Sequence, residues 1–169
     1  MKFSLRFNKN RIRRIAEAYE YPKEDYIINT VAPRTKANGY FTRNDFLAIC
    51  EWKTPRVRSR REKNDSELIK EITSIALTTK SERLRIEILT LLDGVNYPTA
   101  SVILHWCHKK PYPILDFRAL WSLGYDKPPK YDFKFWWEYT QYCRKLAKEC
   151  KVSMRVLDRA LWQYSKENQ

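Results

Sequence analysis

The chain has 169 residues, 43% of them hydrophobic, which is enough to bury a core as one domain or as two small lobes. Only three glycines are present, which argues against a turn-rich all-β fold. The formal net charge of +13 favours an anionic polymer as the partner, and no long apolar run is present to place the chain in a membrane.

The first seven residues lack the apolar core of a signal peptide, so we expect a cytoplasmic, intracellular protein. The four cysteines are widely spaced and form no Cys-x-x-Cys pair. They therefore predict buried thiols rather than ligands of a metal or a cluster. The cysteines are Cys50, Cys107, Cys143 and Cys150.

In the first third of the chain, apolar residues recur at helical spacing. Residues 8–19 predict one helix, and residues 24–38 predict a second that is interrupted near Pro33 and ended by Gly39. Thr42 is a good helix N-cap and predicts the start of a third helix.

Residues 53–63 are the most basic stretch, with six cations against one acid. A solvated loop or helix end is the ordinary explanation for such a run. Because this run follows Trp52 and precedes a hairpin of the phosphate-binding type, we expect it to contact nucleic-acid phosphates. Each phosphate contact adds about one unit to the salt dependence of binding. The candidate contacts are Lys53, Arg56, Arg58, Arg60 and Arg61.

Residues 81–108 predict two helices joined by a tight hairpin. Pro98 is suited to the first turn of the second helix, and Gly94 and Asn96 are residue types that accept a left-handed backbone. Backbone N–H groups at such a helix start form an anion site. The candidate contacts with the nucleic-acid backbone are Gly94, Val95, Asn96, Tyr97 and Thr99.

Beyond the hairpin, residues 111–124 contain Asp116 directly before a short apolar-patterned helix that Gly124 closes. Residues 133–149 predict a long aromatic-rich helix, and Ser153 predicts the start of a final one. Because no segment shows sustained strand alternation, we predict an all-α fold of about 8–10 helices.

Residues 92–100, Leu-Asp-Gly-Val-Asn-Tyr-Pro-Thr-Ala, resemble the helix-hairpin-helix signature, and Pro113-Ile114-Leu115-Asp116 is similar to the Pro-Val-Asp segment of the HhH-GPD family of DNA base-excision glycosylases. In that family, the position before Thr-Ala lies eighteen residues before the catalytic aspartate, and Pro98 and Asp116 have this separation. The resemblance covers about a quarter of the chain. It implies a monomeric HhH-GPD-like domain over residues 1–169 that binds damaged duplex DNA and hydrolyses the N-glycosidic bond of a modified or mismatched base.

Three departures refine this expectation. Pro98 occupies the position of the Schiff-base lysine of bifunctional members, so the resemblance implies a monofunctional enzyme or a relative without activity. Asn96 replaces the second glycine of the signature, and Phe117-Arg118-Ala119 replaces the usual residues after the aspartate. The C-terminal cysteine pattern of iron–sulfur members is missing, so no cofactor is expected. The alternative is a non-catalytic DNA- or RNA-binding module, which would be associated with the nucleoid when bound to DNA. A scaffold for partner proteins is the least favoured hypothesis.

Asp116 has two compatible interpretations. An aspartate before a helix is an ordinary N-cap. The resemblance implies that it also stabilises the positive charge that builds on the sugar during base release. A flipped base would stack on aromatic faces, although aromatic residues at helical spacing are usually core. The candidates for a base pocket are Tyr97, Trp106, Tyr112, Trp121, Arg118 and Trp52.

The end of the second hairpin helix carries four further polar residues. His105 and His108 are three apart, but no carboxylate or cysteine set completes a tetrahedral site, so we predict no metal. Lys109 and Lys110 are in principle displaced amine nucleophiles, and phosphate contact is the preferred interpretation.

Overall fold

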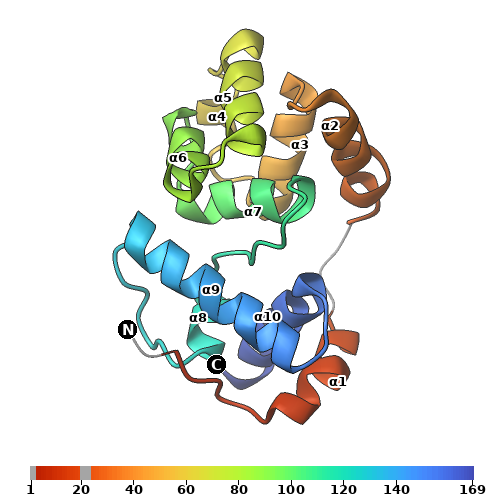
Figure 1. The fold of residues 1–169 in the computed structure, drawn as a ribbon, viewed down its shortest axis with the longest axis vertical. Helices are drawn as coiled ribbons and strands as arrows, with labels where there is room; N and C mark the ends of the chain where they lie inside the picture. The colour runs from red at the N-terminus through yellow and green to blue at the C-terminus, as the bar shows by residue number, and fades with distance from the viewer. Residues whose placement is uncertain (1–2, 20–23) are drawn as a thin grey trace. The chain divides into compact units, whose positions relative to one another are not determined.

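The computed structural model describes residues 3–19 and 24–169, and within these residues the chain forms ten α-helices and no β-strand (Figure 1). The predicted all-α class is therefore confirmed. In the same described residues, no helix combines the length and the apolar character needed to cross a membrane.

The chain divides into two compact units, and each is described by itself. The hairpin unit comprises residues 24–110, and the aspartate unit comprises residues 3–19 and 111–169. The predicted hairpin and basic segment lie in the first unit, and Asp116 lies in the second.

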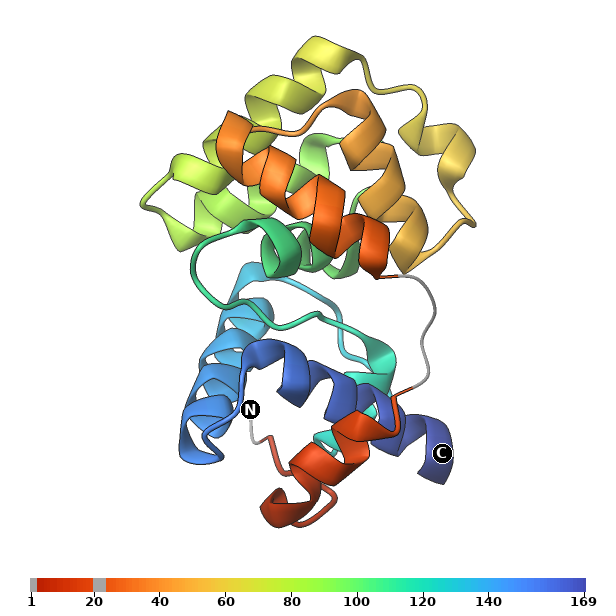
Figure 2. The same ribbon diagram turned by 90° about the vertical axis from the view of Figure 1, so that its right-hand side faces the viewer.

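The hairpin unit begins with a π-helical turn that leads directly into α2, and α2 packs on α7 (Figure 2). Pro33 lies in the first turn of α2, directly after the π-helical turn. Gly39 ends α2 in the left-handed conformation, with φ of 76°. The predicted C-cap is thus confirmed, whereas the predicted interruption near Pro33 is wrong, because the helical backbone continues from the π-helical turn into α2 without a break. The elements of this unit are η2 (Ile27–Val31), α2 (Ala32–Asn38), α3 (Arg43–Lys53), α4 (Arg58–Arg61), α5 (Ser66–Thr78), α6 (Glu82–Glu87), η3 (Ile88–Leu91) and α7 (Tyr97–Cys107).

Polar caps fix the starts of the helices in the hairpin unit. Thr42 caps α3 as predicted, because its Oγ1 accepts from the Asp45 N–H at 3.2 Å and donates to the Asp45 carboxylate at 2.6 Å. Asp45 is fully buried and also binds Arg34, so this carboxylate joins the starts of α2 and α3. Asp65 caps α5 and Ser81 caps α6 in the same way.

The aspartate unit is built on α10, which packs against α1 and α8. Its N-terminal segment is held by two backbone hydrogen bonds, from Ser4 to Leu123 and from Arg6 to Ser122, at 3.0 and 2.9 Å. Aromatic side chains fill much of the interior, where Phe3 contacts four rings on the same unit. The elements are η1 (Lys9–Arg11), α1 (Ile12–Glu17), α8 (Phe117–Ser122), α9 (Phe133–Glu149) and α10 (Met154–Asn168).

The cysteines are free thiols, as the sequence predicts, and three of the four are buried. Burial raises the pKa of Cys50 and of Cys107 to about 12, so both remain protonated at neutral pH. Cys150 is only partly buried.

Candidate nucleic-acid interface and aspartate site

The hairpin joins η3 to α7 through a loop with one left-handed residue. Gly94 has φ of 75°, which confirms its predicted conformation. Asn96 has φ of −129° and ψ of −178°, so the left-handed expectation for this residue is wrong. An extended backbone suits any residue, which explains why the second glycine of the signature is dispensable here. Tyr97 begins α7, and Pro98 lies in its first turn.

The basic segment braces the hairpin loop from the side. Asn64 accepts from the Asp93 N–H at 2.8 Å through its side-chain oxygen and donates to the Asp93 carbonyl at 3.0 Å through its side-chain nitrogen. Arg61 donates from Nε to the Gly94 carbonyl at 3.3 Å. Two segments about thirty residues apart in sequence are therefore fixed to one another by three hydrogen bonds.

Arg61 is a structural residue, which corrects its prediction as a phosphate contact. Its side chain is 2% exposed, and its Nη1 donates to the carbonyls of Cys50 at 2.9 Å and Thr54 at 2.6 Å. A side chain that is buried and bound to carbonyls cannot reach a phosphate. A β-carbon at Gly94 would lie 2.8 Å from the Arg61 Cγ, so the loop needs glycine for space as well as for its conformation.

The other arginines of the basic segment are exposed. Within residues 3–19 and 24–169, no acidic partner is found for Arg56 or Arg60, whereas Arg58 pairs with Glu51 at 3.0 Å and with Glu62 at 2.8 Å. Arg60 lies beside the hairpin, since its Cβ is 3.4 Å from the β-carbon position of Gly94. We refer to the exposed Arg56, Arg60 and Lys63 and the half-buried Lys53 as the cationic side of the hairpin; of these, Arg60 is the residue that the structure places next to the loop.

Two predicted hairpin contacts have buried side chains. Val95 is 7% exposed and its N–H donates to the Leu92 carbonyl at 3.1 Å, so Val95 is corrected to a packing residue. The Thr99 side chain is also buried, which leaves only its backbone N–H, in the first helical turn, to serve an anion. Asn96 is exposed, and the Tyr97 hydroxyl contacts the Glu87 carboxylate at 3.3 Å.

Trp52 and Trp106 are brought together in the hairpin unit. Their rings meet edge to face, with centroids 5.7 Å apart, and His105 packs on Trp106 at 5.1 Å. Both indoles are half-buried and thus retain accessible surface.

Asp116 is the N-cap of α8, and its Oδ1 accepts from the Arg118 N–H at 2.9 Å. The predicted capping role is therefore confirmed. The carboxylate is half-buried, and its negative charge contributes to raising the pKa of Tyr131, for which burial is the main cause. Burial is also the main cause that raises the pKa of Tyr139, ahead of Cys143, Asp158 and Asp116, and the Tyr139 hydroxyl donates to the Ile114 carbonyl at 2.7 Å. Both phenols remain protonated near this aspartate.

Two further predicted pocket residues of the aspartate unit, Arg118 and Trp121, are both half-buried. The Arg118 guanidinium lies over the rings of Phe117 and Trp162, at 5.2 and 5.4 Å. Trp121 is half-buried and carries the Arg6 guanidinium 4.4 Å above its ring.

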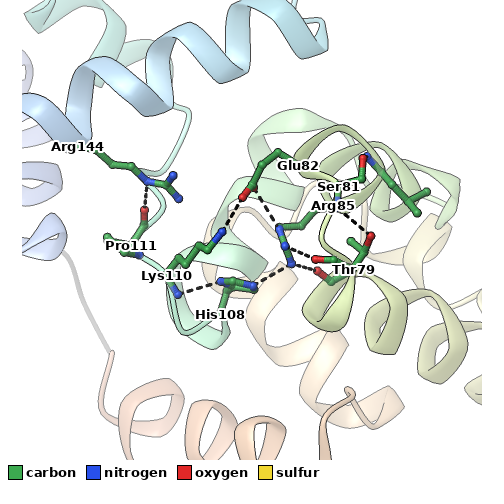
Figure 3. Close-up of polar contacts among 10 residues, drawn as sticks. Thr79, Ser81, Glu82, Arg85, His108, Lys110, Pro111 and Arg144 are labelled. Carbon is green, nitrogen blue, oxygen red and sulfur yellow. Dashed lines mark hydrogen bonds and ion pairs between the residues drawn. The ribbon is translucent and has the colours of Figure 1, made fainter.

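Tyr112 is corrected to a core residue. Its side chain is fully buried, it stacks on Trp136 with centroids 5.7 Å apart, and it carries the Arg144 guanidinium at 4.5 Å. Arg144 in turn donates to the Pro111 carbonyl at 2.8 Å (Figure 3). This stacking leaves no face of Tyr112 for a flipped base.

Sequence reasoning did not single out Asn64 or Tyr131. The reciprocal bonds of Asn64 span 29 residues, and no local pattern signals them. Tyr131 follows a Pro-Pro turn, which marks a loop but not its closeness to Asp116. In the part of the chain that the structure describes, no group of three His, Cys, Asp or Glu residues is arranged to hold a metal ion.

The chain was compared with models of protein families, with curated proteins and with solved structures, and none of the three comparisons gave a match.

Proposed function

We propose that this protein binds duplex DNA through the hairpin and its cationic side, and hydrolyses the N-glycosidic bond of a modified or mismatched base. The observation that carries the proposal is the bracing of Gly94 and Asp93 by Arg61 and Asn64. This bracing places the exposed Arg60 next to a loop that leads into the N-terminus of α7.

Phosphate chemistry explains why these features belong together. The first-turn N–H groups of α7 and the positive end of its dipole favour an anion. Neighbouring guanidinium groups add charge and can donate paired hydrogen bonds to phosphate oxygens. Because Arg61 and Asn64 hold the loop by hydrogen bonds, its backbone has a fixed geometry beside the exposed Arg60.

Asp116 is the proposed catalytic carboxylate. In the reaction, the C1′–N bond breaks and its electrons leave with the base, water forms a new bond to C1′, and the proton lost by water ends on the departed base. A fixed carboxylate stabilises the cationic sugar in the transition state and can orient the water. The cap to the Arg118 N–H fixes the Asp116 side chain, as such a role requires. Tyr131, half-buried and protonated, is a polar group near this carboxylate.

Pro98 limits the chemistry to hydrolysis. A lyase needs an amine that forms a Schiff base with the sugar, and Pro98 has none. The product should therefore be an intact abasic strand that breaks only after alkali treatment. Borohydride should trap no adduct between protein and DNA, and a strong adduct would direct attention to Lys109 and Lys110.

A second candidate is a non-catalytic DNA- or RNA-binding module. One specific observation favours it: the N-cap of α8 accounts for the position of Asp116 without any reaction. In that case the hairpin and cationic side retain their role, and no base is released.

The binding test uses salt titrations of duplex affinity. For Arg56→Glu combined with Arg60→Glu, we expect the slope of log affinity against log salt to fall by about two units, because two side chains no longer neutralise phosphates. The control is Lys145→Glu with Lys148→Glu, which makes the same charge change on the exposed side of α9. Affinity without salt dependence, or equal effects of the two variants, would refute the interface. The enzyme test incubates the protein with duplexes carrying different altered bases, followed by alkali.

A further inference from the structure

An open pocket of about 740 Å³ lies in the hairpin unit at the end of α7 that is remote from the hairpin loop. The hairpin leads into Tyr97 at the start of α7, whereas Cys107 and His108 at its end line the pocket. Since α7 has eleven residues, the two ends are separated by about 16 Å. The pocket is therefore a different place from the proposed DNA contact.

The lining of this pocket is strongly cationic. It includes four lysines and one arginine, and its residues include no aspartate or glutamate. All four lysines are exposed at its rim. The cations are Lys36, Lys80, Lys109, Lys110 and Arg85.

Arg85 forms the rigid floor. It is 2% exposed, and its guanidinium donates to the Ala76 carbonyl at 2.7 Å, to the Thr79 carbonyl and to Glu82 at 3.2 Å (Figure 3). Glu82 also binds the Lys110 ammonium at 3.1 Å. Arg85 thus caps the C-terminus of α5, and its own charge is balanced by Glu82.

His108 is the neutral part of the floor. Its Nδ1 accepts from the Lys110 N–H at 2.9 Å, and its Nε2 lies 2.8 Å from the Arg85 Nη1. Burial, followed by the positive charge of Arg85, lowers the pKa of His108 to about 4. The imidazole is therefore uncharged at neutral pH.

Lysines near helix C-termini commonly offset helix dipoles, so the amount of charge decides the interpretation. The C-terminal ends of α2, α5 and α7 meet here, and each carries roughly half a negative charge. When the charge of Glu82 and these three dipoles are set against the five cations, an excess of roughly two to three positive charges remains. The α5 end is already capped by Arg85, so the lysines exceed what the helices need.

We propose that this pocket binds a small phosphorylated ligand of nucleotide size. The lysines would meet the phosphates, while Leu77 and the hydroxyls of Thr78 and Thr79 offer an apolar face and polar contacts for the remainder. The volume lies within the range of ordinary small-molecule sites, about 300–1,000 Å³. This proposal is independent of the proposed DNA glycosylase activity.

The test measures binding of ATP, inorganic triphosphate and adenosine to the full chain by calorimetry. We expect ATP and triphosphate to bind and adenosine to bind far more weakly. Lys80→Glu combined with Lys109→Glu should weaken ATP binding by about a hundredfold, roughly tenfold for each charge-assisted hydrogen bond removed. Both lysines are exposed, so the thermal midpoint should hold; Lys145→Glu with Lys148→Glu is the matched control.

Two results would overturn the proposal. The first is that ATP does not bind, or that the pocket double variant and the control double variant weaken ATP binding equally. The second is that duplex DNA displaces ATP and that the Lys80→Glu, Lys109→Glu variant loses as much duplex affinity as the Arg56→Glu, Arg60→Glu variant. In the second case the pocket holds DNA phosphates instead. Failure of the DNA interface itself is seen separately, in the salt titration of the Arg56 and Arg60 variant.

Discussion

The hairpin and the aspartate segment are held in place by different kinds of contact. At the hairpin, residues from a distant segment converge on the loop: Arg61 and Asn64 hold Gly94 and Asp93. At Asp116, the cap is a local hydrogen bond, made with the N–H two residues later. The hairpin loop is therefore fixed by tertiary contacts, whereas the position of Asp116 is fixed by a local helix cap.

The largest expected effect separates two adjacent arginines. Arg61→Ala removes a buried guanidinium from three carbonyls, so we expect the free energy of unfolding to fall by about 3 kcal/mol. Arg60→Ala alters an exposed side chain and should change it by less than about 0.5 kcal/mol, while weakening duplex binding. Chemical denaturation and a binding titration on both variants measure this contrast. If Arg60→Ala proved the more destabilising, the bracing of the hairpin would be wrongly assigned.

Asp116→Asn addresses the other side of the comparison. Asparagine retains a good N-cap, so stability should change by less than about 1 kcal/mol. The loss of the negative charge should slow base release by about 10²-fold, equivalent to about 2.7 kcal/mol in the barrier. Single-turnover release from a processed duplex is the measurement.

The control for this variant is Asp116→Ala, which removes both cap and charge. If Asp116→Asn kept full activity, the catalytic assignment would be wrong. If no altered base is ever released and only Asp116→Ala lowers stability, the aspartate is a cap and the protein is a binding module.

Two glycines with the same backbone conformation test the close approach at the hairpin. Gly94 and Gly39 have φ of 75° and 76°. A β-carbon at Gly94 would lie 2.8 Å from the Arg61 Cγ, whereas a β-carbon at Gly39 would have no atom within 4 Å. We expect Gly39→Ala to cost about 1 kcal/mol and Gly94→Ala about 2 kcal/mol, because only the second adds a steric clash to the strain. Only Gly94→Ala should weaken duplex binding. Equal costs measured by thermal unfolding would mean that Arg61 moves aside freely.

Local patterns predicted the helices and their caps well. Thr42, Ser153 and Asp116 each cap a helix as expected, because a cap depends on residues within one turn. Accessibility was predicted less well. Arg61 and Arg60 are neighbours of the same type, and contacts with the hairpin and with the end of α3 make Arg61 buried while Arg60 stays exposed.

Aromatic residues show the same limit at the candidate site. Tyr112 and Trp121 both flank Asp116 in sequence, yet Tyr112 is stacked inside the aspartate unit and Trp121 is half-buried. Their difference depends on Trp136 and Arg6, which are distant in sequence. Helical spacing alone carries no information about such partners.

The smallest expected effect concerns pH and the other end of α7. The pKa of His108 is lowered to about 4 in the folded protein by burial and by Arg85, with Glu82 opposing, against about 6.5 in the unfolded chain. The unfolded state therefore takes up the proton first as pH falls, and stability that is complete above pH 6.5 is lost progressively between pH 6.5 and 4. At pH 5 we expect this loss to be about 1 kcal/mol once solvent screening is allowed for.

His108→Gln should remove that part of the acid sensitivity, because glutamine does not titrate. The measurement is the change in unfolding free energy between pH 7 and pH 5, compared between the native protein and His108→Gln. The contribution of the carboxylates is the same in both proteins and cancels in the difference. Identical pH dependence in the native protein and His108→Gln would mean that the imidazole takes up its proton as readily when folded as when unfolded. The proposed neutral floor of the lysine-lined pocket would then carry a positive charge in mild acid.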